Sequence, residues 1–264
     1  MTAIHFGTHL REWRQRRHLS QLDLALSADI SARHLSFVET GRAQPSREMV
    51  LRLAEHLDVP LRERNVLLTA AGFAPIFAER ALDDPALQAA RKAVELVLKG
   101  HEPFPALAVD RHWTMVMANG AVAPLLTGAA PALVKPPVNV LRLSLHPDGL
   151  APRIANLDEW RAHLLERLRR QVETTADPVL VDLLKELKGY PVPRRPAPVP
   201  VTGWGGVAVP FRLATDAGVL SFISTTTVFG NPVEVTLSEL ALEAFFPADA
   251  TTAEIIHGMA QKRR

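Results

Sequence analysis

The sequence predicts an α+β protein, in which an all-helical N-terminal segment is followed by an antiparallel sheet wrapped by helices. Two observations predict this class. Helix caps and a 3.6-residue apolar period mark about five short helices in the first seventy-five residues. Further along, alternating apolar runs separated by turn residues predict strand pairs. We expect three parts, namely residues 1–75, a connecting helix within 76–100, and a second domain at 101–264.

The N-terminal helices are predicted from their end signals. Ser20, Ser31 and Ser46 each stand before an apolar-periodic segment as N-caps, and Asp23 completes a near capping box with Ser20. Gly41 is a typical C-terminal stop. We expect helices over residues 6–17, 20–28, 31–41, 46–58 and 60–72.

The second and third of these helices, joined by a tight turn, form a helix-turn-helix candidate. Leu35 and Val38 share one face and predict that the third helix is held from behind, which leaves its N-terminal turn free to enter a major groove. Residues 1–52 contain eight arginines, no lysine and five acidic residues. Arginine donates in a planar fork that suits phosphates and guanine edges, although a solvated helix face would also carry such charge.

These residues resemble the helix-turn-helix regulators of the XRE/Cro-CI type, through "LSQLDLA", "ISARHLSFVETGR" and "PSREMVLRLAEHLDVP". The resemblance covers about seventy residues. It implies that Gln21 and Ser31 contact phosphates and that Arg33 is the principal base reader. It also implies an internal salt bridge between Arg14 and Glu39.

Four further residues are candidates for DNA contact. Ala32 and Phe37 occupy the other groove-facing positions of the family pattern, while His34 and Arg42 lie close to them. Two departures stand out. Phe37 replaces the usual polar reader, so it either contacts a thymine methyl or packs internally. The turn position often occupied by glycine is Asp29, which we expect to adopt a left-handed conformation.

The rest of the chain mixes helices and strands. We expect helices at 87–99, 157–172 and 178–187, a hairpin of 106–110 with 113–118, and a strand pair at 207–215 and 218–229. Asn119 is expected to cap a helix that follows it. The stretch at 190–206 is rich in proline and predicts an extended loop. Residues 235–249 fit either a helix or a strand, and we favour a strand followed by a terminal helix from Thr251 or Thr252.

This second part resembles the MmyB-like branch of the same regulators, through "FPALAVDRHW", "NVLRLSLHPDGLAP", "ELKGYPV" and "FGNPVEVTLSELALEAFFPAD". The resemblance implies a PAS-like ligand-binding domain that accepts a small apolar molecule, with fatty-acid-like ligands as one class. Apolar side chains on the expected strands could line such a pocket, and the alternative is that they form an ordinary hydrophobic core. These residues are Trp113, Met115, Met117, Phe211, Phe222 and Ile223. Arg142 and His146 are expected to meet a carboxylate at the pocket mouth, although Arg142 also fits a surface ion pair.

Composition narrows the function classes. The chain of 264 residues has no cysteine, which fits a reducing cytoplasm. Its first residues lack signal-peptide features, and no apolar run approaches the roughly 20 residues of a membrane helix. No HExxH, glycine-rich phosphate loop or GxSxG motif occurs, so we expect no metal, cofactor or catalytic site.

The function that we expect is a cytoplasmic, homodimeric regulator of transcription that binds double-stranded DNA and responds to a small-molecule effector. Two alternatives stay open. One is an enzyme fused to an autoregulatory DNA-binding module, which a polar cleft would favour. The other is a ligand-free dimerisation or interaction domain fused to a helix-turn-helix, which a solid second domain would favour.

Overall fold

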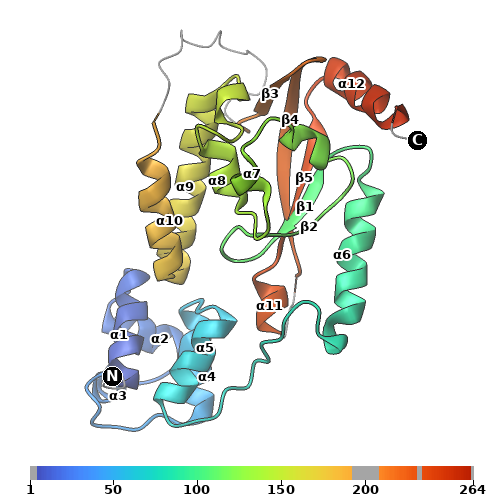
Figure 1. Ribbon diagram of the computed structural model, residues 1–264. Coiled ribbons are helices and arrows are strands. Elements are labelled where there is room, and N and C mark those ends of the chain that lie inside the picture. Colours follow the sequence, from blue (N-terminus) through green and yellow to red (C-terminus); the bar gives the residue numbers. More distant parts are fainter. Residues whose placement is uncertain (1–4, 192–207, 231–233, 263–264) are drawn as a thin grey trace. The chain divides into compact units, whose positions relative to one another are not determined.

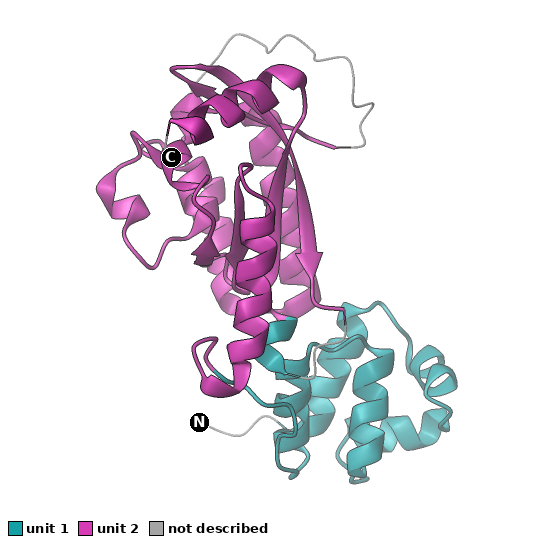
Figure 2. Cartoon of the chain, turned by 90° about the vertical axis from the view of Figure 1, so that its right-hand side faces the viewer, with its two compact units in different colours: residues 1–80, 231–238 teal, residues 81–230, 239–264 magenta. Residues whose placement is uncertain are grey.

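The computed structural model describes residues 5–191, 208–230 and 234–262. The chain divides into two compact units, shown in different colours in Figure 2. Unit 1 contains residues 1–80 and 231–238, and unit 2 contains residues 81–230 and 239–264. The boundaries that the sequence predicts near residues 75 and 100 stay predictions.

Unit 1 is helical, and its serine caps form as predicted. The side chains of Ser20, Ser31 and Ser46 each accept a hydrogen bond from the backbone N–H three residues further on. These caps satisfy N–H groups that a helix start leaves unpaired. The helices, labelled in Figure 1, are α1 (Phe6–Arg16), α2 (Gln21–Ser27), α3 (Ala32–Glu39), α4 (Arg47–His56), α5 (Leu61–Ala70) and the short α11 (Val235–Ser238).

Helix α1 approaches the end of α3 closely at Gly7. A Cβ atom added at Gly7 would lie 2.6 Å from the Val38 carbonyl oxygen and closer still to that of Glu39. Any larger side chain would therefore push the two helices apart. Leu10, Leu35 and Val38 are fully buried in the core that the helices share.

A distant segment completes unit 1. The backbone N–H of Val235 donates to the Ala78 carbonyl at 2.8 Å, and the Glu234 carboxylate accepts from the Arg80 N–H at 2.8 Å. Residues 234–238 are therefore joined to the end of the N-terminal segment by hydrogen bonds, which sequence patterns did not predict.

Unit 2 contains a five-stranded antiparallel sheet in the order β2-β1-β5-β4-β3. Its strands are β1 (Ala106–Val109), β2 (Met115–Ala118), β3 (Phe211–Thr215), β4 (Gly218–Val228) and β5 (Ala241–Pro247). Its α-helices are α6 (Gln88–Gly100), α7 (Pro131–Val134), α8 (Val140–Leu145), α9 (Leu157–Thr175), α10 (Pro178–Lys188) and α12 (Ala250–Gln261). Short 3₁₀ turns lie at η1 (Pro85–Leu87), η2 (Ala123–Leu126) and η3 (Ala151–Arg153).

Helices cover both faces of this sheet (Figure 1). Leu107 and Val109 of β1 point into a large core that includes α8, α9 and α10. Ala106 and Ala108 alternate with them and pack under Val94 and Leu98 of α6. Period-two alternation therefore gives β1 two buried faces, the larger of which contains the candidate site.

Three sequence predictions for the chain beyond residue 100 need correction. Asn119 is not the N-cap of η2, although its oxygen accepts from the Ala121 N–H in the turn before η2. Its amide donates to the Leu98 and Phe104 carbonyls and its oxygen also accepts from the Ala106 N–H, which fixes the start of β1. The next element is the 3₁₀ turn η2. Trp113 precedes β2 instead of belonging to it. Residues 235–247 form both a short helix, α11, and a strand, β5, because Val235–Ser238 closes one helical turn before the chain extends.

Other predictions hold within a few residues, including the five N-terminal helices, both hairpins and the helices α6, α9, α10 and α12. The short helices α7 and α8 were not predicted. Most of the proline-rich loop prediction falls on residues 192–207, outside the described residues. Within the described ranges, no helix has the length and apolarity needed to cross a membrane.

Candidate functional site

The first part of the candidate site is the exposed N-terminal turn of α3. Leu35 and Val38 fix the rear of the helix in the core of unit 1, whereas Arg33 is exposed. Asp29 has φ 52°, the left-handed conformation expected for the turn that leads into α3. The Ser31 hydroxyl accepts from the His34 N–H at 3.1 Å. The helix therefore begins at a defined residue with its positive dipole end and Arg33 outward.

A buried carboxylate fixes this helix to α1 and α2. Glu39, at the end of α3, accepts hydrogen bonds from Arg14 (2.6 and 3.0 Å), from the Gln21 amide (2.7 Å) and from Arg11 (3.4 Å). Burial acts to raise the pKa of the Glu39 carboxyl, but the hydrogen bonds from Arg14 and Gln21 outweigh it and the pKa lies below its ordinary value. The internal salt bridge between Arg14 and Glu39 therefore forms as the resemblance implies.

The remaining predicted DNA-contacting residues lie along α3 and just beyond its two ends. Ser31 and Arg42 are exposed, and Ala32 is half-buried. The Arg33 guanidinium lies over the half-buried Phe37 ring, 5.3 Å from its centroid. The His34 ring turns toward α4, where its Nε2 is 3.3 Å from the Met49 sulfur.

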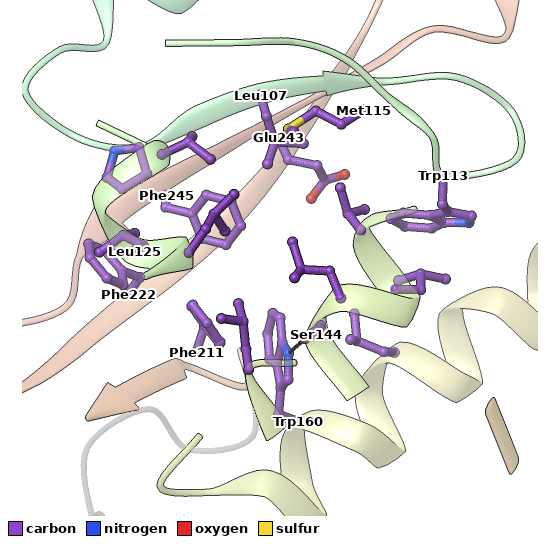
Figure 3. Close-up of a pocket in the computed structure, with 18 of the residues that line it drawn as sticks. Leu107, Trp113, Met115, Leu125, Ser144, Trp160, Phe211, Phe222, Glu243 and Phe245 are labelled. Atoms are coloured by element: carbon purple, nitrogen blue, oxygen red, sulfur yellow. Dashed lines mark hydrogen bonds between the residues drawn. The ribbon is translucent and has the colours of Figure 1, made fainter. Parts of the chain in front are cut away.

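The second part of the candidate site is a cavity inside unit 2, shown in Figure 3. The volume of the cavity is about 100 Å³, which is several times the space that one water needs. The sheet forms one wall, while α8, α9 and η2 form the others. Most lining residues are apolar: Pro105, Leu107, Trp113, Met115, Val122, Leu125, Leu126, Val140, Leu141, Leu143, Leu150, Trp160, Leu164, Phe211, Phe222 and Phe245.

One paired charge lines this cavity. Arg167 of α9 donates to both carboxylate oxygens of Glu243 on β5, at 3.0 and 2.5 Å. The Thr226 hydroxyl accepts from Arg167 at 2.6 Å and donates to Glu243 at 3.0 Å. The Glu243 side chain is only 6% exposed and the Arg167 side chain 28%. The charges of Arg167 and Glu243 therefore neutralise each other in a bidentate ion pair within the cavity wall.

Trp113 is held over this pair by an unusual backbone conformation. Its φ is 65°, which is rare for a bulky residue. The Asp110 carboxylate accepts from the N–H groups of His112 and Thr114 on either side, and the Trp113 indole donates to Gln171 at 2.7 Å. The Trp113 ring consequently lies 4.5 Å from the Arg167 guanidinium carbon.

The Ser144 hydroxyl is a second polar group in the cavity wall, on the side opposite the Arg167–Glu243 pair. Figure 3 shows Ser144 and Trp160 on the side away from the Glu243 carboxylate. The Ser144 hydroxyl accepts from the Trp160 indole N–H at 3.0 Å. Behind Trp160 stacks the His163 ring, 5.5 Å away. Burial, then the nearby Arg167, lowers the pKa of His163, which favours its neutral form.

Four predicted ligand-contacting residues line this cavity, namely Trp113, Met115, Phe211 and Phe222. Met117 and Ile223 do not. Val109 pairs with Met115 but its neighbour Ala108 pairs with Met117, so a bulge inserts one residue into β2. The bulge turns Met117 to the opposite face, against the α6 cluster.

Arg142 and His146 also lie outside the cavity wall. Arg142 forms a bidentate pair with Glu186 of α10, at 2.9 and 2.8 Å, and Glu186 also accepts from the Tyr190 hydroxyl at 2.5 Å. Burial and this carboxylate raise the pKa of Tyr190 to about 12. The His146 ring meets the Tyr190 ring edge-on. These contacts join α8 to α10. Arg142 therefore forms an ion pair, which is the alternative to a ligand contact that the sequence left open.

The sequence analysis did not predict the cavity-lining residues of α9 and β5, which include the charged pair. Trp160, Leu164 and Arg167 follow a helical spacing along one face of α9, a signal that was present in the sequence. Glu243 and Phe245 line the cavity, whereas Leu242 and Ala244, which alternate with them along β5, pack in the cluster that contains Val94 and Leu98 of α6. Because β5 is covered on both sides, the charged residue points inward too.

A helix-turn-helix in one unit and an apolar cavity in the other are the architecture of a DNA-binding regulator with a ligand-binding domain. Comparison with known families agrees. The family model described as MmyB-like transcription regulator ligand binding domain matches residues 90–257, and a helix-turn-helix model matches residues 10–64. The first match covers more than half of the chain, so the protein belongs to the MmyB-like transcription regulators.

Among solved structures, the clp gene regulator ClgR from Corynebacterium glutamicum is similar, at 28% identity, over 37% of this chain and 90% of its own, with a TM-score of 0.23. No curated protein matches the sequence.

Proposed function

We propose that this regulator reads operator DNA with the first turn of α3. Arg33 donates to a guanine edge, while Ala32 and Phe37 face the groove beside it. The observation that supports this reading is the exposure of Arg33 on a helix whose rear is fixed by Leu35, Val38 and Glu39.

We assign the phosphate contacts to polar side chains at the starts of α2 and α3 and just after the end of α3. Ser31 at the start of α3 and Arg42 just after its end are exposed, and the half-buried His34 contacts Met49 of α4. Gln21 gives one amide N–H to Glu39, and the second N–H of the same group is the donor that we assign to a phosphate.

One bidentate arginine–guanine contact supplies about 1–3 kcal/mol of discrimination. Specific binding of an operator needs about 4–10 kcal/mol over non-specific binding. We therefore propose that a cytoplasmic homodimer reads two half-sites.

We further propose that the cavity of unit 2 binds a small apolar effector, with molecules that carry a fatty-acid-like chain as the class. The almost entirely apolar lining supports effector binding over catalysis. The cavity itself supports a sensory role over a solid interaction module. An effector that fits one dimer arrangement better than another shifts the spacing of the two α3 helices and so the affinity for the operator.

The DNA half is tested by selecting binding sites from random duplexes and measuring affinity by fluorescence anisotropy. Arg33→Ala should weaken binding and relax one base position. Arg91→Ala, which removes the same charge from an exposed position on α6, is the control and should change neither. Unchanged sequence preference in Arg33→Ala would contradict the assignment of the reader.

The effector half is tested by native mass spectrometry of the purified protein and by operator titrations with the released molecule. We expect an apolar molecule that changes operator affinity. A protein that carries no molecule and whose operator affinity responds to no apolar compound would contradict this half alone.

A further inference from the structure

We propose that the effector enters the cavity with an uncharged polar head, such as a hydroxyl, amide or ester, and not as a carboxylate. This inference rests on the proposed effector function and specifies the chemistry of the molecule. It follows from the charged and polar groups that line the cavity.

Among the described residues, Arg167 is the one cationic side chain that lines the cavity. It is already held by Glu243 through both carboxylate oxygens, and Thr226 bridges the two groups. The wall that a ligand meets is therefore neutral at this end. A ligand carboxylate would gain no net attraction from this pair.

Displacing Glu243 would not make room for an anion. Its side chain is 6% exposed and lies in an apolar surround that includes Met115 and Phe245. A ligand carboxylate that took over Arg167 would leave Glu243 as a buried unpaired charge, which is strongly destabilising. If both carboxylates shared Arg167, like charges would lie side by side, and one would have to take up a proton.

The other end of the cavity offers a neutral donor instead. The Ser144 hydroxyl accepts from Trp160, and its own proton has no acceptor among the described residues. A hydroxyl, carbonyl or ester oxygen of a ligand can accept this proton without bringing a charge into the cavity. A carboxylate placed there would meet one hydroxyl and no cation, and would lose most of its hydration.

The test compares decanoic acid, decanol and decanamide, which share a chain length and so present closely similar apolar surface. Binding to the full-length protein is measured at pH 7.5 by isothermal titration calorimetry, with tryptophan fluorescence as a second readout. We expect decanol and decanamide to bind at least tenfold more tightly than decanoate.

A charge variant tests the cause of this order. Glu243→Gln removes the internal counter-charge, so we expect decanoate to gain at least tenfold while decanol changes little. Glu186→Gln, which removes a carboxylate that pairs with Arg142 outside the cavity, is the matched control and should keep the wild-type order. If the Glu243→Gln variant fails to fold, the order of the three affinities in the wild-type protein alone decides whether the head group is uncharged.

The outcomes separate the two proposals. Binding of decanoate to the wild type as tight as that of decanol overturns the uncharged-head inference and leaves the apolar effector standing. Failure of all three compounds to bind up to their solubility limits overturns the apolar-chain effector as well. Unaltered decanoate affinity in a folded Glu243→Gln protein overturns the role assigned to the internal pair.

Discussion

Replacing Arg14 by methionine should test how α3, the helix to which we assign DNA reading, is fixed to α1 and α2. The Arg14–Glu39 pair is almost fully buried, with side-chain exposures of 10% and 0%. Methionine keeps the apolar length of Arg14 but leaves the Glu39 carboxylate with Gln21 and the longer contact to Arg11. Breaking a buried pair on one side costs about 3–5 kcal/mol. Because two donors remain, we expect about 3 kcal/mol.

Such a loss is a large share of the roughly 5–15 kcal/mol that stabilises a typical domain. Hydrogen exchange of α3 amides, followed by mass spectrometry, measures it locally, so that the unfolding of unit 2 does not mask it. The exchange of α3 should accelerate about a hundredfold, which corresponds to about 3 kcal/mol.

A double variant, Arg14→Met with Glu39→Met, removes both charges. Buried pairs replaced by apolar side chains are often neutral in stability. We therefore expect the double variant to recover at least about 2 kcal/mol relative to Arg14→Met alone. Arg91→Met, which breaks an exposed pair with Glu95 on α6, is the control and should leave α3 exchange unchanged. A loss below about 1 kcal/mol in Arg14→Met, or no recovery in the double variant, would refute this reasoning.

Three further outcomes follow. Arg33→Ala should weaken operator binding about 5- to 150-fold, equivalent to about 1–3 kcal/mol, in anisotropy titrations over operator variants. The pKa of Glu39 is lower in the folded state than in the unfolded state. Its contribution to the stability of unit 1 is therefore present above the ordinary glutamate pKa of about 4.3 and is lost as the pH falls through the folded-state pKa. Acid unfolding of unit 1 should show this loss of stability, and the double methionine variant should not show it. Gly7→Ala should accelerate α1 and α3 exchange, since its Cβ would collide with the Val38 carbonyl; wild-type exchange would count against that close approach.

The sequence alone determined most of unit 1. Its helix ends depend on contacts within a few residues, such as the Ser20 capping box and the stop at Gly41, whose φ is 73°. The apolar stripe of α3 gave the buried face, and the exposed Arg33 followed from it. Local signals suffice where each element is defined by its own neighbours.

The tertiary structure decided the cavity wall in unit 2. Which methionine of β2 points inward depends on a bulge in its pairing with β1, and the register of a bulged pair cannot be read from alternation in one strand. The pairing of Arg167 with Glu243 joins residues 76 positions apart. Such contacts arise from how strands and helices meet across the fold, because side chains distant in sequence become neighbours only when the sheet and α9 are packed together.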